Sequence, residues 1–186
     1  MAQTINNTIT HGVSGKFGDQ IVFRQVNGKT LMCKSPISRG KTSAKQEQQQ
    51  EKFKKASQYA KQALEDPALS AEYTLEAKRR KGLSAYNVAV ADYLTSPTIE
   101  QVDISAYTGN VGEKIKVQAY DDYKVKSVKV YIHTSSSSLV EEGSATQQGI
   151  EWIYTAQTSN TNLSGTKITV KVSDFAGNVT EKLVEV

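Results

Sequence analysis

The sequence predicts a mixed α+β protein in which an N-terminal module of a β-hairpin and helices precedes an all-β sandwich of about seven strands. Three observations carry this prediction. An Asn-Gly dipeptide separates two short alternating runs, helix-forming residues fill most of 43–94, and apolar and polar residues alternate in short runs from Thr98 onward. The change of pattern at Pro97 divides the 186 residues into a module over 1–97 and a domain over 98–186.

The N-terminal hairpin is predicted from the runs 17–26 and 29–34 on either side of Asn27-Gly28. A type I′ turn needs positive φ at both central residues, which Asn and Gly tolerate best. Residues 1–15 are rich in Asn, Thr and Gly, and we expect a flexible or partner-dependent arm there. Because isolated hairpins are marginal in water, this one is expected to pack on something else.

A first helix is predicted to begin at Ser43, which forms a capping-box pattern with Gln46, and to end before Asp66-Pro67. The intervening residues are mostly Gln, Glu, Lys and Ala, which favour helix. The expected apolar stripe of this helix comprises Phe53, Ala56, Ala60, Ala63 and Leu64.

Two further helices follow in the pattern. Ser70 is expected to cap a helix that runs to about Lys81 and ends at Gly82. Ser84 is expected to start a third helix, which continues through Leu94. The large apolar residues of the second helix are Tyr73 and Leu75.

The C-terminal residues alternate with the period of a half-buried strand. Turn-rich gaps separate the runs at the spacing typical of a sandwich, and Trp152 is expected in its core. The predicted strands are 99–105, 115–119, 128–132, 139–142, 150–154, 168–172 and 179–186.

Composition excludes several classes of protein. With one Cys and two His, no metal-binding Cys or His spacing exists, and no apolar run is long enough for a membrane-spanning helix. The formal net charge of +4 is uneven, because residues 1–97 carry +7 and residues 98–186 carry −3. All four Arg lie in the first half, so the two halves are chemically different.

No catalytic, cofactor-binding or metal-ligating set is predicted. Gly12–Gly18 lacks the strand, the helix and the Ser or Thr of a phosphate-binding loop. Asp121, Asp122 and Asp174, with Asn178, carry oxygen atoms of the kind that Ca²⁺ binds, but they form no ligand string and are interpreted as turn-capping residues. Cys33, with no His near it in sequence, is interpreted as a packing residue.

The C-terminal half resembles bacterial immunoglobulin-like repeats. The resemblance lies in 115–130, with its "A-x-D … V-x-x-V-x-V" pattern, in Trp152-Ile-Tyr154, and in 168–178, which ends Asp-Phe-Ala-Gly-Asn. It implies an immunoglobulin-like fold and identifies no ligand.

The N-terminal half resembles an uncharacterised family of proteins from gut-type bacteria and their phages. Ser14–Asp19, Lys34-Ser-Pro36, Thr42–Gln46 and Phe53 carry the resemblance, although Glu or Gln stands where the family usually has Arg. The family implies a structural or virion-associated role and brings no catalytic residues.

We therefore expect a non-enzymatic assembly protein, a phage virion component of the capsid-auxiliary, decoration or tail-associated kind, made in the host cytoplasm. Its partners would be copies of itself or other virion proteins in a multi-copy assembly. The absence of a secretory signal in the sequence favours this over a cell-surface adhesion or carbohydrate-binding module. A nucleic-acid-associated protein is a further alternative, because the first half is basic, but glutamates interleave its lysines.

The candidate docking residues are Lys16, Phe17, Arg24, Arg39, Lys41 and Lys45, and the candidate contact loop is Ser135, Ser136, Ser137 and Ser138.

Overall fold

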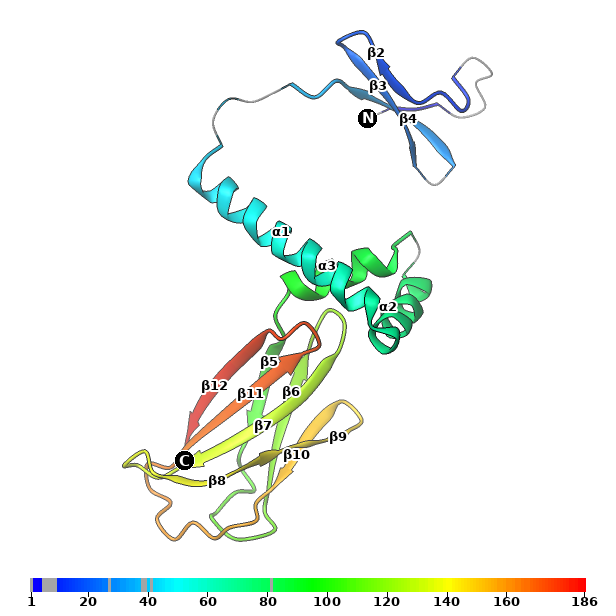
Figure 1. The fold of residues 1–186 in the computed structure, drawn as a ribbon. Coiled ribbons are helices and arrows are strands. Elements are labelled where there is room, and N and C mark those ends of the chain that lie inside the picture. Colours follow the sequence, from blue (N-terminus) through cyan, green and yellow to red (C-terminus); the bar gives the residue numbers. More distant parts are fainter. Residues whose placement is uncertain (1, 5–9, 27, 38–39, 41, 81) are drawn as a thin grey trace. The chain divides into compact units, whose positions relative to one another are not determined.

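The computed structural model describes residues 2–4, 10–26, 28–37, 40, 42–80 and 82–186. The mixed α+β class is confirmed: these residues form three helices and three antiparallel sheets (Figure 1). The chain divides into two compact units, Met1–Gln49 and Gln50–Val186. The division differs from the boundary expected at Pro97, because the helical segment packs with the C-terminal strands. None of the described helices is long and apolar enough to cross a membrane.

The N-terminal unit contains the predicted hairpin, formed by β3 (Ile21–Val26) and β4 (Lys29–Lys34). Gly28 has a φ of +74°, as the tight turn requires, while Asn27 lies outside the described residues. Two more strands, β1 (Ala2–Thr4) and β2 (Gly15–Phe17), extend this hairpin into a sheet of order β1-β4-β3-β2.

Of the two alternatives expected for residues 1–15, the flexible arm is wrong where the structure describes strands, and the partner-dependent arm stays a prediction. Ala2–Thr4 pairs with Thr30–Met32, and Gly15–Phe17 pairs with Ile21–Phe23 after a turn at Gly18. Both additions are three-residue edge strands without alternation of their own. They pair with the backbone N–H and C=O groups along the two outer edges of the central hairpin, and the alternation of apolar and polar residues does not reveal such pairing.

The helices are α1 (Ala44–Glu65), α2 (Pro67–Arg79) and α3 (Ala85–Leu94). The predicted capping box exists, since the Ser43 N–H donates to Gln46 Oε1 at 2.9 Å. Ser70, however, is not a cap but lies inside α2. The Asp66 carboxylate caps α2 instead, and Pro67 takes the first helical position, where a missing N–H costs nothing.

Residues 50–94, which include most of α1 and all of α2 and α3, form what we call the helical bundle. Its core uses small residues of α1 and larger ones of the other helices. Two residues expected on apolar faces, Phe53 and Leu75, are instead 53% and 58% exposed. The buried residues are Ala56, Ala60, Ala63, Tyr73, Val88, Ala89 and Val90.

The remaining residues form two four-stranded sheets of order β5-β6-β10-β9 and β12-β11-β7-β8 (Figure 1). Their side chains share one hydrophobic core, in which Trp152 is buried as predicted. The strands described number eight rather than about seven, because the short polar β9 was not predicted. They are β5 (Thr98–Asp103), β6 (Lys114–Tyr120), β7 (Val125–His133), β8 (Leu139–Ser144), β9 (Thr146–Gln148), β10 (Glu151–Thr155), β11 (Lys167–Asp174) and β12 (Val179–Glu185).

Two glycines in the β5–β6 connection offer a matched test of this packing. Gly109 and Gly112 have nearly equal φ values, +92° and +90°, but a Cβ at Gly109 would lie 2.4 Å from the Asn160 carbonyl oxygen whereas one at Gly112 would meet nothing. We expect Gly112→Ala to lower the free energy of unfolding by about 1 kcal/mol, from backbone strain alone. Gly109→Ala should cost about 1–3 kcal/mol more, because the backbone of Asn160 must move.

Urea denaturation of both variants measures the difference. Equal losses of unfolding free energy would mean that the loops containing Gly109 and Asn160 are not packed against each other as described.

Candidate functional site

The helical bundle packs on one end of the two sheets (Figure 1). The sheets contribute two connections there, residues 121–124 between β6 and β7 and residues 175–178 between β11 and β12. We call the region in which these connections meet the helices the junction.

A chain of hydroxyl groups runs through the junction. The Tyr73 hydroxyl donates to Asp92 Oδ2 at 2.6 Å and lies 2.8 Å from the Tyr59 hydroxyl, which is 3.2 Å from the Phe175 carbonyl oxygen. The Tyr73 ring also packs on Tyr123, with centroids 5.0 Å apart. Burial and the bond to Asp92 raise the pKa of Tyr73 far above its usual range, so this phenol remains a hydrogen-bond donor.

The Asn178 side chain caps the C-terminal end of α3. Its Nδ2 lies within 3.2 Å of the carbonyl oxygens of Asp92, Tyr93 and Thr95, and it also donates to Asp174 Oδ2 at 2.7 Å. The last carbonyls of a helix lack partners inside the helix. A turn between two strands therefore supplies the donor that α3 lacks.

Ion pairs join α2 to the 121–124 connection. Arg80 Nη1 lies 3.0 Å from Asp122 Oδ2, and Lys124 Nζ lies 2.6 Å from Glu72 Oε2. Glu72 also accepts from the Tyr123 hydroxyl, and these two partners lower the pKa of its carboxyl group. Because these groups are partly exposed, each pair adds little stability alone, but together they orient the connection.

Three carboxylates meet inside the junction: Asp92 from α3, Asp121 after β6 and Asp174 at the end of β11. One ligand oxygen from each lies within 4.8 Å of the others. Asp92 and Asp174 are almost fully buried. Burial, together with the charges of Asp174 and Asp121, raises the pKa of Asp92 to about 7, although the Tyr73 bond opposes the rise.

The sequence interpretation of these acidic residues was incomplete. Asp174 does cap its turn, since its Oδ1 accepts from the Asn178 N–H at 2.7 Å. Asp122 pairs with Arg80 and takes no part in the cluster. Asp92 was missed, although a carboxylate within the otherwise apolar stretch Val88–Tyr93 is a signal that could have identified it.

The candidate docking residues are divided between surfaces. Lys16 and Phe17 are neighbours on β2 and therefore project from opposite faces of the N-terminal sheet. Arg24 opposes Leu31 across the hairpin, on the same face as Lys16. Phe17 is 73% exposed, while Lys16 forms an ion pair with Asp19 at 2.7 Å.

The other three docking candidates do not join this group. Lys45 is exposed in the first turn of α1. Arg39 and Lys41 lie outside the residues that the structure describes.

The four serines form an exposed turn between β7 and β8, as predicted. Thr134 closes it, because its N–H donates to the Ser138 carbonyl and its own carbonyl accepts from the Ser137 N–H, both at 2.9 Å. Ser137 has a φ of +65°, which is unusual for a residue with a side chain. The turn lies at the end of β7 opposite the junction (Figure 1).

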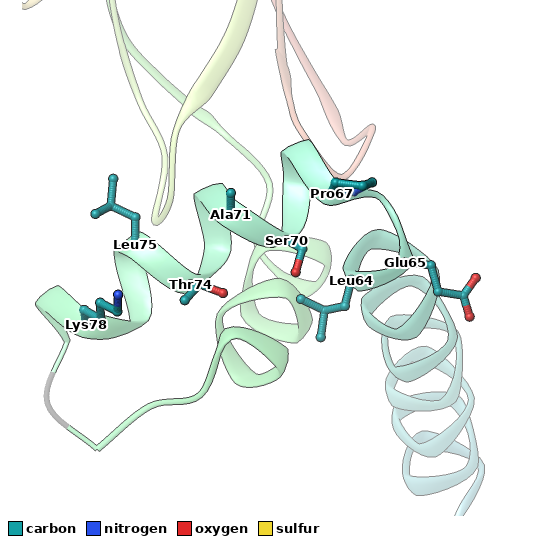
Figure 2. A pocket seen from close by; sticks show the side chains of 8 residues that line it. All are labelled: Leu64, Glu65, Pro67, Ser70, Ala71, Thr74, Leu75 and Lys78. Carbon is teal, nitrogen blue, oxygen red and sulfur yellow. The ribbon is translucent and has the colours of Figure 1, made fainter.

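A groove of about 530 Å³ lies between the end of α1 and α2 (Figure 2). Leu64, Ser70 and Thr74 are among the side chains that line it, with Lys78 farther along α2. Besides hydroxyls and aliphatic groups, its lining has one carboxylate, Glu65, and one ammonium group, Lys78, and therefore no pair of carboxylates and no set of metal ligands.

Comparisons with protein-family models, with curated proteins and with solved structures found no match to this chain.

The Asn178 cap gives a direct test of the junction. Asn178→Ala should lower the free energy of unfolding by about 1–3 kcal/mol, because it removes the donor facing three helix carbonyls. Asn162→Ala is the matched control, since only backbone atoms of this exposed residue form the hydrogen bonds described for it.

Thermal denaturation of both variants measures the effect, and the control should stay within about 0.5 kcal/mol of the unmodified chain. Equal stabilities of the two variants would show that Asn178 does not hold α3.

Proposed function

We propose that this protein is a non-enzymatic structural component of a phage virion, of the capsid-auxiliary, decoration or tail-associated kind. In this proposal the N-terminal sheet docks on other protein subunits of a multi-copy assembly. The unit Gln50–Val186 then presents an immunoglobulin-like domain, braced by helices, on the outside of the particle.

The observation that carries the proposal is that the N-terminal sheet has no core of its own. Among the described residues from 10 to 49, only Thr30 and Ser35 are buried. Cross-strand register places apolar side chains on both faces of the sheet. A single small sheet must bury such faces against another layer to be stable, and a protein partner would supply that layer. Phe17, Ile21, Phe23 and Met32 lie on one face, and Val22, Leu31 and Cys33 on the other.

Charge indicates what kind of partner fits. Lys16, Arg24 and Lys29 share the face that carries Leu31 and Cys33. A protein surface that combines apolar groups with Asp and Glu would complement this face. Copies of this chain or other virion proteins are the partners we propose.

The order of strands supports the immunoglobulin-like part of the proposal. If the eight strands from β5 to β12 are lettered A, B, C, C′, D, E, F and G, the two sheets have the orders A-B-E-D and G-F-C-C′. Immunoglobulin-type sandwiches use these two sheets, the second extended by C′ in the variable type. Such modules serve many functions, so the fold alone supports an outward-facing domain without naming its ligand.

A virion location would reconcile these features, because virion proteins are made in the host cytoplasm and end exposed to the outside. Particles purified from cells that express this chain with its neighbouring genes should contain it in a constant copy number by mass spectrometry. Its absence from washed particles would overturn the virion role.

Amide hydrogen exchange tests the docking role. In the dilute monomer, amides of Ile21–Lys34 should exchange with opening free energies near zero, whereas those of β7 and β11 should approach the global value. In an assembled sample the hairpin amides should become protected. Strong protection of Ile21–Lys34 in a monomer would contradict the proposal.

A pair of substitutions locates the docking surface. Phe17→Ser removes an exposed aromatic side chain from β2 and should weaken assembly, measured by sedimentation velocity, without changing stability. Ile150→Ser is the control, because Ile150 is 83% exposed in the other unit. Equal assembly by both variants would exclude the face that carries Phe17.

A further inference from the structure

We propose that Asp92, Asp121 and Asp174 bind a divalent cation, Ca²⁺ in particular, which joins the helical bundle to the two sheets. This site goes beyond the assembly role and does not depend on it.

The spacing of the three carboxylates fits one Ca²⁺ ion. Ca²⁺ binds oxygen at about 2.3–2.6 Å, so two ligands on opposite sides of the ion are roughly 4.6–5.2 Å apart. One oxygen from each of the three carboxylates lies within 4.8 Å of the other two. Small side-chain adjustments would therefore bring all three within reach of one ion.

The cluster contains buried oxygens that lack hydrogen-bond donors. Asp92 has no exposed surface, and its Oδ2 accepts from Tyr73, but its Oδ1 has no partner. Both carboxylate oxygens of Asp121 are shielded from solvent and form no hydrogen bond of normal geometry, with only weak contacts to the backbone N–H groups of Asp122 and Tyr123. A buried acceptor without a donor is costly, and a cation would satisfy these oxygens together.

The cluster also lacks a balancing positive charge. No ion pair among the described residues involves Asp92, Asp121 or Asp174. Of the cationic side chains in this region, Arg80 and Lys124 are engaged by Asp122, Glu76 and Glu72. Lys126 lies over the ring of Phe175, 5.9 Å from its centroid, and forms none of the ion pairs described.

The type of ligand favours Ca²⁺ among divalent ions. The set is all carboxylate, with no His or Cys, which disfavours the softer transition metals. Asp174 is held in place by the Asn178 N–H and side-chain amide, both at 2.7 Å. Ca²⁺ accepts irregular shells of six to eight oxygens, to which a carboxylate can contribute one or both of its oxygens. Mg²⁺ requires a smaller, near-octahedral shell, which three carboxylates from separate elements fit less well.

The three ligands come from three separate segments: α3, the β6–β7 connection and the end of β11. A bound ion would therefore link the bundle to both sheets. It would replace repulsion among three carboxylates by attraction to one ion, and the folded state would gain stability by mass action.

The experiment compares the chelator-treated full chain in CaCl₂, in MgCl₂ and in NaCl of equal ionic strength. Isothermal titration calorimetry should show one Ca²⁺ per chain, and the melting temperature should rise with CaCl₂ well beyond its rise with NaCl. Tb³⁺, a luminescent substitute for Ca²⁺, should be sensitised by Tyr73, whose hydroxyl touches Asp92.

Two variants remove single ligands with little other change. Asp121→Asn breaks no side-chain hydrogen bond of normal geometry, and Asp92→Asn keeps an acceptor for Tyr73. Both should abolish the Ca²⁺-dependent shift and the Tb³⁺ signal. In Ca²⁺-free buffer both should melt at or above the temperature of the unmodified chain, because repulsion is relieved. Asp122→Asn, which alters the adjacent ion pair with Arg80, should keep the response to Ca²⁺.

Two results would overturn the proposal. One is the absence of Ca²⁺ binding at about 10 mM, above the range of even weak extracellular Ca²⁺ modules. The other is a response to Ca²⁺ that Asp121→Asn leaves unchanged. A response to MgCl₂ equal to that to CaCl₂ would overturn the choice of ion.

Discussion

The contact between Asn178 and the end of α3 is the interaction on which the arrangement of the C-terminal unit depends. It places one side-chain amide against the carbonyls of Asp92, Tyr93 and Thr95. Since Thr95 is three residues before β5 begins, the same contact fixes where the chain enters the first sheet. The hydrogen bonds that join Asp92 of α3, Tyr73 of α2 and Tyr59 of α1 then connect all three helices. The polar contact between α3 and the β11–β12 turn thus joins the helical bundle and the two sheets into one unit.

Local elements were predictable because their signals are local. The capping pattern of Ser43 with Gln46 and the alternation around Val128–Ile132 both describe structure formed within a few residues. The strand Ala2–Thr4 was not predictable, because only the open edge of β4 makes it a strand. The carboxylate cluster was equally hidden, since Asp92, Asp121 and Asp174 lie far apart in sequence and only tertiary packing brings them together. The charge change at Pro97 marks a change of composition, whereas the compact unit begins at Gln50.

The two proposals place different demands on the two units. The N-terminal sheet has apolar faces, and its residues that the structure describes form no core, which suits a segment that gains stability by joining a partner. The C-terminal unit has two cores linked by a buried polar junction, which suits a domain that must stay folded when displayed. A cation between Asp92, Asp121 and Asp174 would strengthen that link, and the exposed Ser135–Ser138 turn would then face away from it.

The most direct measurement of the central claim follows the unfolding of Gln50–Val186 by two probes in one urea titration of the full chain. Trp152 is the only tryptophan and lies in the core between the two sheets, so its fluorescence reports on the sheets. The helical band of the circular dichroism spectrum reports on α1, α2 and α3. If the junction makes the bundle and the sheets one cooperative unit, the two transitions will coincide in midpoint and slope. Loss of the helical signal at a lower urea concentration than the Trp152 transition would contradict the account.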